Sequence, residues 1–326
     1  MDGYVTDDTL TRLARRTGLQ TLSSKAGSFL GNNKRELHLF LESAGLPVVA
    51  TELATTPEEL GQALRQIKAA GFRSGVIKSG IGASGIGLVK VESLEDADAV
   101  TREVPDHFFF EGSCLVQGWL SPGSHGVIRV RSPSAQLFLS DDSIMIYDLT
   151  EQILSQSSVH EGNESTPPYL AERREWREEL LRQAGVAARW LHGQGYRGTG
   201  SVDFLLVELE DGGADVYVCE INARITGATY PSVLARHFLP EGSRLLRNLR
   251  FETPLPGEDL IALLEKSGDL FRPGESETGV FPVNFSAGAD GLVHKGQFLC
   301  LAHSTAGSHV LLEMAELDLP CSPDRH

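Results

Sequence analysis

Four polar residues between positions 203 and 224 have the types and spacing to hold a metal ion and a phosphate. Glu220 and Asn222 are two apart in a predicted strand, so both face one way, and Asp203 lies in the predicted partner strand. Two carboxylates and an amide oxygen form a hard-oxygen site suited to Mg²⁺ bridging phosphates. Arg224 continues this face, where a guanidinium would stabilise a transferring phosphoryl group. A solvated polar hairpin face is disfavoured because the surrounding strand residues are apolar.

A glycine-rich loop follows Lys78. The segment Gly80–Gly85 has the spacing G-x-G-x-x-G, but strand-forming residues follow at 88–91, where a dinucleotide-binding loop would open a helix. A protein-kinase loop is also disfavoured, because here the lysine precedes the glycines. A loop between two strands has the geometry of a flap whose N–H groups cover phosphates, and an ordinary glycine-rich hairpin is the alternative. Lys78 would reach a nucleotide phosphate, unless it is only a solvated residue at a strand end.

The elements that must position these residues form a mixed α+β pattern. Asn32 or Asn33 is expected to cap the helix that starts at Lys34. The turn Glu-Asp-Gly-Gly at 210–213 joins the two strands that carry the acidic residues. From residue 259 the chain alternates short helices and strands. The patterns predict helices over 34–44, 56–70, 93–104 and 172–193, strands over 48–51, 75–78, 88–91, 114–117, 200–207 and 216–221, and a hairpin from 126–131 and 136–140.

Composition limits the classes of protein. The chain has 326 residues, 41% hydrophobic and 22% charged, which is enough apolar material for a core. Its net charge of −15 argues against non-specific binding to nucleic acid or anionic membranes. No apolar run approaches the roughly 20 residues of a membrane helix, and the N-terminus does not resemble a signal peptide. Four scattered cysteines without CxxC spacing favour a reduced, cytoplasmic protein.

Lys78 with its glycine loop, followed in order by Asp203 and the motif Glu-x-Asn-x-Arg at 220–224, resembles the ATP-grasp superfamily over residues 30–240. The resemblance implies an α+β fold in which two α+β subdomains clasp ATP, with a small C-terminal α/β extension. It implies four regions: a remnant of a preceding region at 1–30, an N-terminal and central subdomain at 31–125, a C-terminal subdomain with the Mg²⁺ site at 126–240, and the extension at 241–326.

The resemblance also assigns roles to individual residues, with ATP and Mg²⁺ as cofactors. Lys34, by itself an ordinary helix residue, and Lys78 match the two nucleotide-contacting basic positions, and Arg224 matches the catalytic arginine, with Lys78 also assigned to catalysis. Asp203, Glu220 and Asn222 match the Mg²⁺ ligands. The remaining nucleotide-binding positions are the flap residues Gly82, Ala83, Ser84 and Gly85 and the adenine-linker residues Gln117, Gly118, Trp119 and Leu120.

Smaller motifs resemble the branch that contains the peptide ligase of pheganomycin biosynthesis. They lie at 131–136, 150–154, 220–231 and 279–284. The chain departs from that branch in having only about 30 residues before the core, where relatives carry a longer domain. It also has Gly118 where many relatives place an acidic residue.

The expected activity is that of an ADP-forming carboxylate–amine ligase, which makes an amide through an acyl phosphate. The substrates would be a small carboxylate and the amine of an amino acid or peptide, with no nucleic-acid or membrane partner and with a homo-oligomer left open. Two alternatives stay open. One is an ATP-grasp enzyme with a non-amine acceptor such as a thiol or bicarbonate, and the other is a truncated, non-catalytic nucleotide-binding protein.

Overall fold

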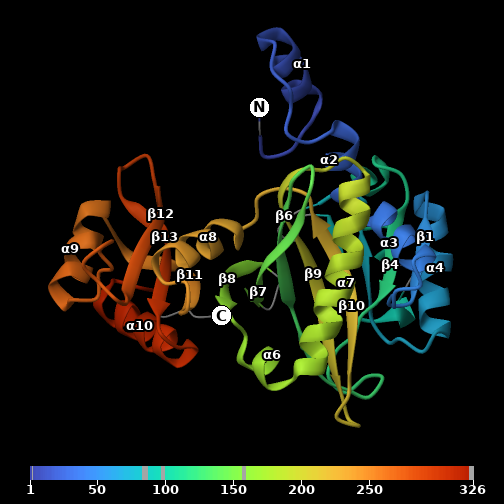
Figure 1. The fold of residues 1–326 in the computed structure, drawn as a ribbon. Helices are drawn as coiled ribbons and strands as arrows, with labels where there is room; N and C mark the ends of the chain where they lie inside the picture. The colour runs from blue at the N-terminus through green and yellow to red at the C-terminus, as the bar shows by residue number, and fades with distance from the viewer. Residues whose placement is uncertain (2, 83–86, 97–99, 156–158, 323–326) are drawn as a thin grey trace. The chain divides into compact units, whose positions relative to one another are not determined.

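The computed structural model describes residues 1, 3–82, 87–96, 100–155 and 159–322 (Figure 1). They fold into two compact units, one from 1–147 and 175–225 and the other from 148–174 and 226–326. The four regions expected from the sequence were defined by their expected functions, and that division stays a prediction. In the described part of the chain, no helix is long and apolar enough to span a membrane.

The first unit contains a four-stranded antiparallel sheet with the order β1-β4-β2-β3. Helix α4 begins with Pro57 in its first turn and packs against β1 and β4. Leu60, Leu64 and Ile67 of α4 are buried in one core with Ile77. The elements of this part are α1 (Asp8–Thr17), α2 (Lys25–Gly31), α3 (Lys34–Ser43), β1 (Thr51–Ala54), α4 (Pro57–Ala69), β2 (Gly75–Lys78), β3 (Leu88–Val91), the 3₁₀ turns η1 (Leu94–Asp96) and η2 (Asp106–Phe109), and β4 (Cys114–Gly118).

The rest of the first unit is built on a long hairpin, β9 (Gly198–Leu209) and β10 (Ala214–Asn222), as the Glu-Asp-Gly-Gly turn predicts. The other edge of β9 pairs with β5 (Val127–Arg131) and β6 (Pro133–Leu139). Helix α7 (Arg174–Gly193) is tied to the hairpin by Gln183, whose buried Nε2 donates to the carbonyl of Val216 at 2.9 Å.

The second unit has an antiparallel sheet in the order β7-β8-β11-β13-β12. Alternate residues of β11 face two cores: Leu245 packs with α9 and α10, and Leu246 packs with α8. Its elements are β7 (Ile144–Leu154), which begins in the first unit, β8 (His160–Ser165), α6 (Pro168–Glu172), α8 (Thr229–Phe238), β11 (Ser243–Leu255), α9 (Gly257–Ser267), β12 (Gly279–Ala287), β13 (Val293–Ala302) and α10 (Thr305–Asp318).

Three secondary-structure predictions differ from the structure. The strand expected at 48–51 is wrong, because the pairing with β4 begins only at Thr51. The hairpin expected from 126–131 and 136–140 is also wrong: β5 and β6 lie end to end along β9, since the single residue Ser132 between them is too short to reverse the chain. In the helix expected over 93–104, residues 94–96 form η1, Val100 is helical and 101–103 form turns, while 97–99 lie outside the described residues.

Candidate active site

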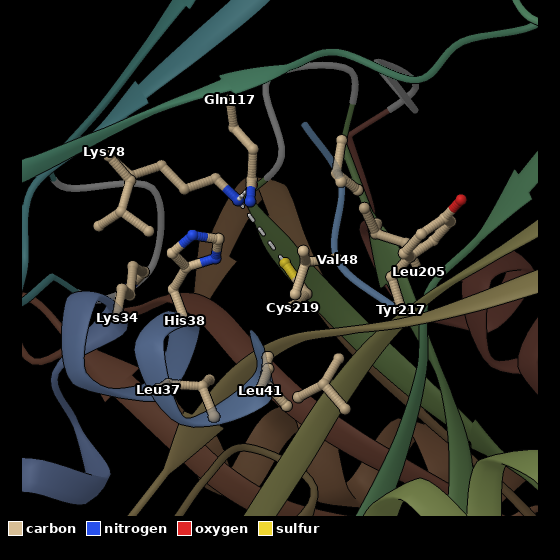
Figure 2. Close-up of a pocket in the computed structure, with 13 residues that line it drawn as sticks. Lys34, Leu37, His38, Leu41, Val48, Lys78, Gln117, Leu205, Tyr217 and Cys219 are labelled. Atoms are coloured by element: carbon tan, nitrogen blue, oxygen red, sulfur yellow. Dashed lines mark hydrogen bonds between the residues drawn. The ribbon is translucent and has the colours of Figure 1, made fainter. Parts of the chain in front are cut away.

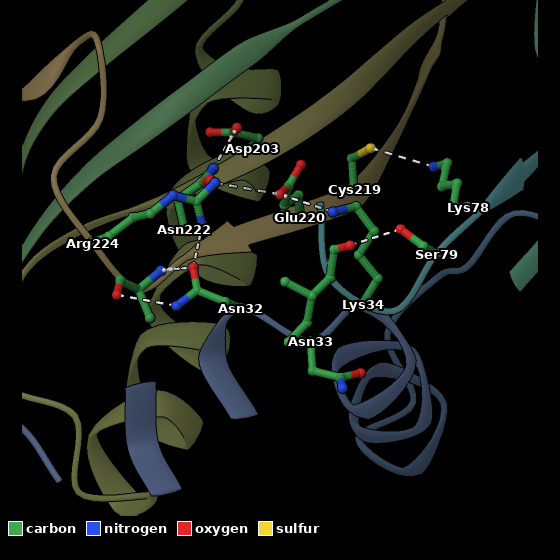
Figure 3. A network of polar contacts seen from close by, with 12 residues as sticks. Asn32, Asn33, Lys34, Lys78, Ser79, Asp203, Cys219, Glu220, Asn222 and Arg224 are labelled. Atoms are coloured by element: carbon green, nitrogen blue, oxygen red, sulfur yellow. Dashed lines mark hydrogen bonds and ion pairs between the residues drawn. The ribbon is translucent and has the colours of Figure 1, made fainter. Parts of the chain in front are cut away.

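The hairpin β9–β10 brings the acidic residues together. Asp203 lies opposite Glu220, and Ser201 lies opposite Asn222, just after a bulge in β10 that shifts the register. Asn222 Nδ2 donates to Asp203 Oδ2 at 2.9 Å (Figure 3). The three residues predicted to hold a metal ion therefore come from one hairpin, with the Asn222 oxygen Oδ1 left to act as a ligand.

Asp203 is a half-buried carboxylate in a polar setting. Its Oδ1 accepts hydrogen bonds from Ser134 Oγ at 2.6 Å and from Ser201 Oγ at 3.1 Å. Burial raises the pKa of Asp203 to about 6, and the Glu220 charge adds to this, while the two hydroxyls and the Arg224 charge oppose it. Two neighbouring carboxylates under burial repel one another, so a cation between them would be strongly favoured.

Glu220 is shared between two cations. Its Oε1 lies 3.0 Å from Lys34 Nζ and 3.9 Å from Arg224 Nη2 (Figure 3). The side chains of Lys34 and Arg224 are 14% and 10% exposed, so these ion pairs are only partly screened by solvent. Lys34 therefore contacts the predicted metal ligand Glu220 directly, which the sequence did not indicate.

The donor set fits a hard divalent cation. The carboxylates of Asp203 and Glu220 and the amide oxygen of Asn222 are ligands that Mg²⁺ prefers, and Mg²⁺ sites commonly use one or two carboxylates completed by water and phosphate oxygens. Among the described residues, no group of three or more His, Cys, Asp or Glu side chains is placed to hold a metal ion.

Lys78, at the end of β2, is held by a chain of polar contacts. The residue is only 8% exposed, and its Nζ donates to Gln117 Oε1 at 2.8 Å and lies 3.8 Å from Cys219 Sγ. Gln117 Nε2 in turn donates to Thr51 Oγ1 at 2.8 Å, which fixes the orientation of the amide. The side chain of Gln117 thus positions Lys78.

Lys78, Gln117 and Cys219 line one pocket of about 420 Å³, counting its open side (Figure 2). The predicted metal ligands Asp203, Glu220 and Asn222 are not among its lining residues. The lining combines an apolar wall with a few polar groups, the pattern expected of a site for a nucleobase and its phosphates. The lining residues are Lys34, Leu37, His38, Leu41, Val48, Val49, Lys78, Leu115, Gln117, Leu205, Tyr217, Val218 and Cys219.

His38 is a pocket residue that the sequence analysis missed. It is buried, and burial lowers its pKa, with the Lys78 charge acting in the same direction and Glu42 opposing it. The ring is therefore held toward the neutral form beside the two lysines. Its position one helical turn after Lys34 was the signal that could have found it.

The stem of the glycine loop is well defined. Ser79 N donates to the carbonyl of Gly87 at 2.8 Å, Ser79 Oγ donates to that of Ile81 at 2.7 Å, and Lys34 N donates to that of Gly80 at 2.8 Å. The start of α3 is therefore fastened to the loop. Gly82 is described, whereas Ala83, Ser84 and Gly85 lie outside the described residues, so the flap stays a prediction.

Most of the predicted adenine-linker residues, 117–120, pack against other parts of the unit and do not line the pocket. Gly118 N donates to Ala50 O at 2.9 Å, and a Cβ at this position would lie 2.5 Å from the Phe72 ring, so only glycine fits. Trp119 lies under Lys90 Nζ, 5.1 Å from the ring centre, and Leu120 packs into the α4 core. Of the four linker residues predicted to bind nucleotide, Gln117 is among those that line the pocket and the other three are not.

Arg224 makes hydrogen bonds to residues of the N-terminal segment, which the sequence analysis also missed. Arg224 Nη1 donates to Asn32 Oδ1, and Arg224 Nε donates to Tyr4 Oη at 3.2 Å. Asn33, and not Asn32, caps α3, because its Oδ1 accepts from the N–H groups of Arg35 and Glu36. Contacts that span about 190 residues of chain leave no local sequence signal.

Comparisons with known proteins agree on one fold. A family model described as an ATP-grasp domain matches residues 32–228. The chain is 30% identical over 200 residues to the butirosin acyl-carrier protein–L-glutamate ligase of Niallia circulans. That match covers 61% of this chain and 44% of the relative, so the chain spans less than half of the relative's length.

Solved structures resemble the chain at low sequence identity. The biotin carboxylase of Campylobacter jejuni, solved as a β-γ-ATP complex, gives a TM-score of 0.70 at 14% identity. The match covers 96% of this chain and 72% of the carboxylase chain. The N5-carboxyaminoimidazole synthase of Aspergillus clavatus, solved with ADP and 5-aminoimidazole ribonucleotide, gives 0.63 at 15% identity and covers 96% and 80%. These likenesses show a shared fold.

Proposed function

The chain belongs to the ATP-grasp family, and on this premise we propose that it is an ADP-forming ligase that joins a carboxylate to an amine through an acyl phosphate. The α+β ATP-grasp fold expected from the motifs is confirmed by the family match and by the solved structures. The identity to a ligase supports the predicted peptide-ligase branch.

One observation supports the proposal most: in a single unit, two cations lie against one of a pair of facing carboxylates, and a third lies beside the neighbouring residue. Glu220 and Asp203 face each other across β9–β10, Lys34 and Arg224 lie against Glu220, and Lys78 lies beside Cys219, the residue before Glu220. Carboxylates that can hold a divalent cation, next to basic side chains, suit a polyphosphate whose charge is neutralised by both. An ordinary surface hairpin would not bury such an arrangement.

The residues have separate tasks in this proposal. Asp203, Glu220 and the Asn222 oxygen would hold Mg²⁺, and Lys34 and Lys78 would bind phosphates of the nucleotide. When bound, Mg·ATP supplies the phosphoryl group that converts the substrate carboxylate into an acyl phosphate. Lys34 has to leave Glu220 for phosphate as the site fills, since the ammonium and the cation compete for the same carboxylate.

Arg224 and Lys78 carry the chemical step. A guanidinium beside the metal ligands faces the oxygens of the transferring group, and a fixed positive charge there stabilises charge that develops in the transition state. Lys78 is held by Gln117 and needs little reorganisation to meet a phosphate. The amine then attacks the acyl carbon, the C–N bond forms and phosphate leaves.

The relative suggests where to begin with substrates. That relative is named as a ligase of L-glutamate and an acyl-carrier protein. We propose that this chain likewise takes a small amino-acid substrate, with L-glutamate as the first probe, and that the second substrate is an amino acid, a peptide or a carrier-bound group.

The test is ADP and phosphate release from Mg·ATP with L-glutamate and pools of amines, with mass spectrometry of the products. Hydroxylamine should trap an acyl phosphate as a hydroxamate. Glu220→Gln is the matched control because it keeps the size of the side chain and removes one ligand charge. Nucleotide turnover with thiols but not with amines, or hydroxamate formation that Glu220→Gln leaves unchanged, would contradict the proposal.

A further inference from the structure

The side chain of Arg224 is held from the N-terminal segment. Its Nη1 donates to Asn32 Oδ1, and the nearest carboxylate oxygen among the described residues is Glu220 Oε1 at 3.9 Å (Figure 3). Arg224 Nε lies 3.2 Å from Tyr4 Oη. Neutral acceptors therefore aim the guanidinium without cancelling its charge. This is the arrangement that an arginine needs if it is to act on a ligand.

Asn32 is itself fixed by backbone groups of Ser28 in α2 and of Ala223, the residue that follows β10. Its Oδ1 accepts from Ala223 N at 3.2 Å, and its Nδ2 donates to Ala223 O at 3.2 Å and to Ser28 O at 2.7 Å. The residue is 8% exposed. The amide thus has one allowed orientation, with its oxygen toward both Ala223 N and the guanidinium, and it links the end of α2 to the residue before Arg224.

Helix α2 is seated closely enough to keep this link rigid. A Cβ on Gly31 would lie 2.6 Å from the Ala223 Cβ, so only glycine allows the approach. At the other end of α2, Ser24 caps the helix by accepting from Gly27 N at 2.9 Å, and Ser24 N donates to Gly195 O at 3.0 Å. Helix α2 is therefore packed as part of the first unit.

We propose that Asn32 is a positioning residue for Arg224, and that the N-terminal segment, through Asn32 and Tyr4, forms part of the wall around the transferring phosphoryl group and the substrate carboxylate. This rests on the proposed function of Arg224. A charged donor fixed where negative charge develops stabilises the transition state. A displacement of about 1 Å can lower the rate by about 10²-fold.

The first measurement reads position without any nucleotide. In protein labelled with ¹⁵N-arginine, the Arg224 Nε–H signal is identified by its loss in Arg224→Lys. We expect Asn32→Ala to shift and broaden this signal. Ser24→Ala is the matched control, because it weakens the seating of α2 without touching the guanidinium, and it should leave the signal in place. An unshifted signal in Asn32→Ala overturns the inference.

The second measurement reads the consequence for phosphoryl transfer with Mg·ADP and fluoroaluminate, a mimic of the transferring group. Asn32→Ala should bind Mg·ADP within about threefold of wild type and lose about 10- to 100-fold of the affinity gained from fluoroaluminate. Tyr4→Phe, at an exposed position that folding tolerates, should lose about threefold of the same gain. Combination with Arg224→Lys should add little further loss.

The outcomes separate this inference from the proposed function. A wild-type protein that binds no Mg·ADP, or gains nothing from fluoroaluminate, contradicts the proposed function, while the arginine signal still decides the position of Arg224. A wild-type gain that Asn32→Ala and Tyr4→Phe both retain overturns the inference. So does an equal loss in Ser24→Ala, since that result would assign the effect to the stability of α2.

Discussion

Two arginines, one in each compact unit, are similarly buried and yet differently partnered. Arg244 in β11 of the second unit is 3% exposed at its side chain and pairs with Asp148, with Ser232 Oγ as a further acceptor. Arg224 in the first unit is 10% exposed and donates to neutral groups, with its nearest carboxylate 3.9 Å away. A buried arginine that is fully neutralised stabilises a fold, whereas one that is aimed but not neutralised is available to a ligand.

The largest effect is expected from breaking the buried ion pair between Arg244 and Asp148. Asp148→Ala leaves Arg244 buried without its carboxylate, and breaking such a pair costs on the order of 3–5 kcal/mol of unfolding free energy. Urea unfolding measures the loss. The double variant Asp148→Leu with Arg244→Met should recover most of it, because an apolar pair needs no partner charge. Stability unchanged in Asp148→Ala would contradict the assignment of Arg244 to structure.

Arg224→Lys should show the opposite profile. Lysine keeps the charge but not the planar fork that holds two oxygens. Loss of one transition-state donor lowers kcat by about 10²–10³-fold, and nucleotide affinity should change by less than about threefold. The readouts are kcat, the Kd for Mg·ATP and the melting temperature. If stability or nucleotide affinity fell in proportion to activity, Arg224 would belong to the same structural class as Arg244.

A third effect concerns the acidic side of the site. The pKa of Asp203 is about 6 in the folded protein, above its ordinary value of 3.8, so the folded state holds the proton more tightly. The stabilising contribution of protonated Asp203 is fully present below pH 3.8 and is lost as the pH rises through about 6, by at most roughly 3 kcal/mol.

The measurement is stability against pH for wild type and Asp203→Asn without metal. The wild-type curve should fall between pH 4 and 6 relative to that of the variant, and Mg²⁺ should restore stability at neutral pH in the wild type only. Parallel curves for the two proteins would show that the burial of Asp203 and its proximity to Glu220 have no energetic consequence.

The local parts of the site were predictable from the sequence. The strand period placed Glu220 and Asn222 on one face, and a turn motif paired their strand with that of Asp203. The helix at Lys34 was found from its apolar spacing and its cap, and the strand at Lys78 was found from its apolar residues. These features depend on neighbours within a few residues, which is the range that sequence patterns record.

The long-range parts were not predictable. Asn32 and Tyr4 accept hydrogen bonds from Arg224, although they lie far from it in the sequence. The side chain of Gln117 accepts a hydrogen bond from Lys78. Gly118, a departure from relatives, is explained by the Phe72 ring that lies against it. Such contacts follow from packing, so only a structure displays them.

The central claim is that the paired carboxylates and the surrounding cations of the first unit bind a magnesium nucleotide. Calorimetric titration of the protein with ATP, with and without Mg²⁺, tests it most directly, with Glu220→Gln as the control that preserves shape. The account predicts binding that requires Mg²⁺ in the wild type and is weakened at least about tenfold in Glu220→Gln. ATP binding that is the same without Mg²⁺, or the same in the variant, would contradict it.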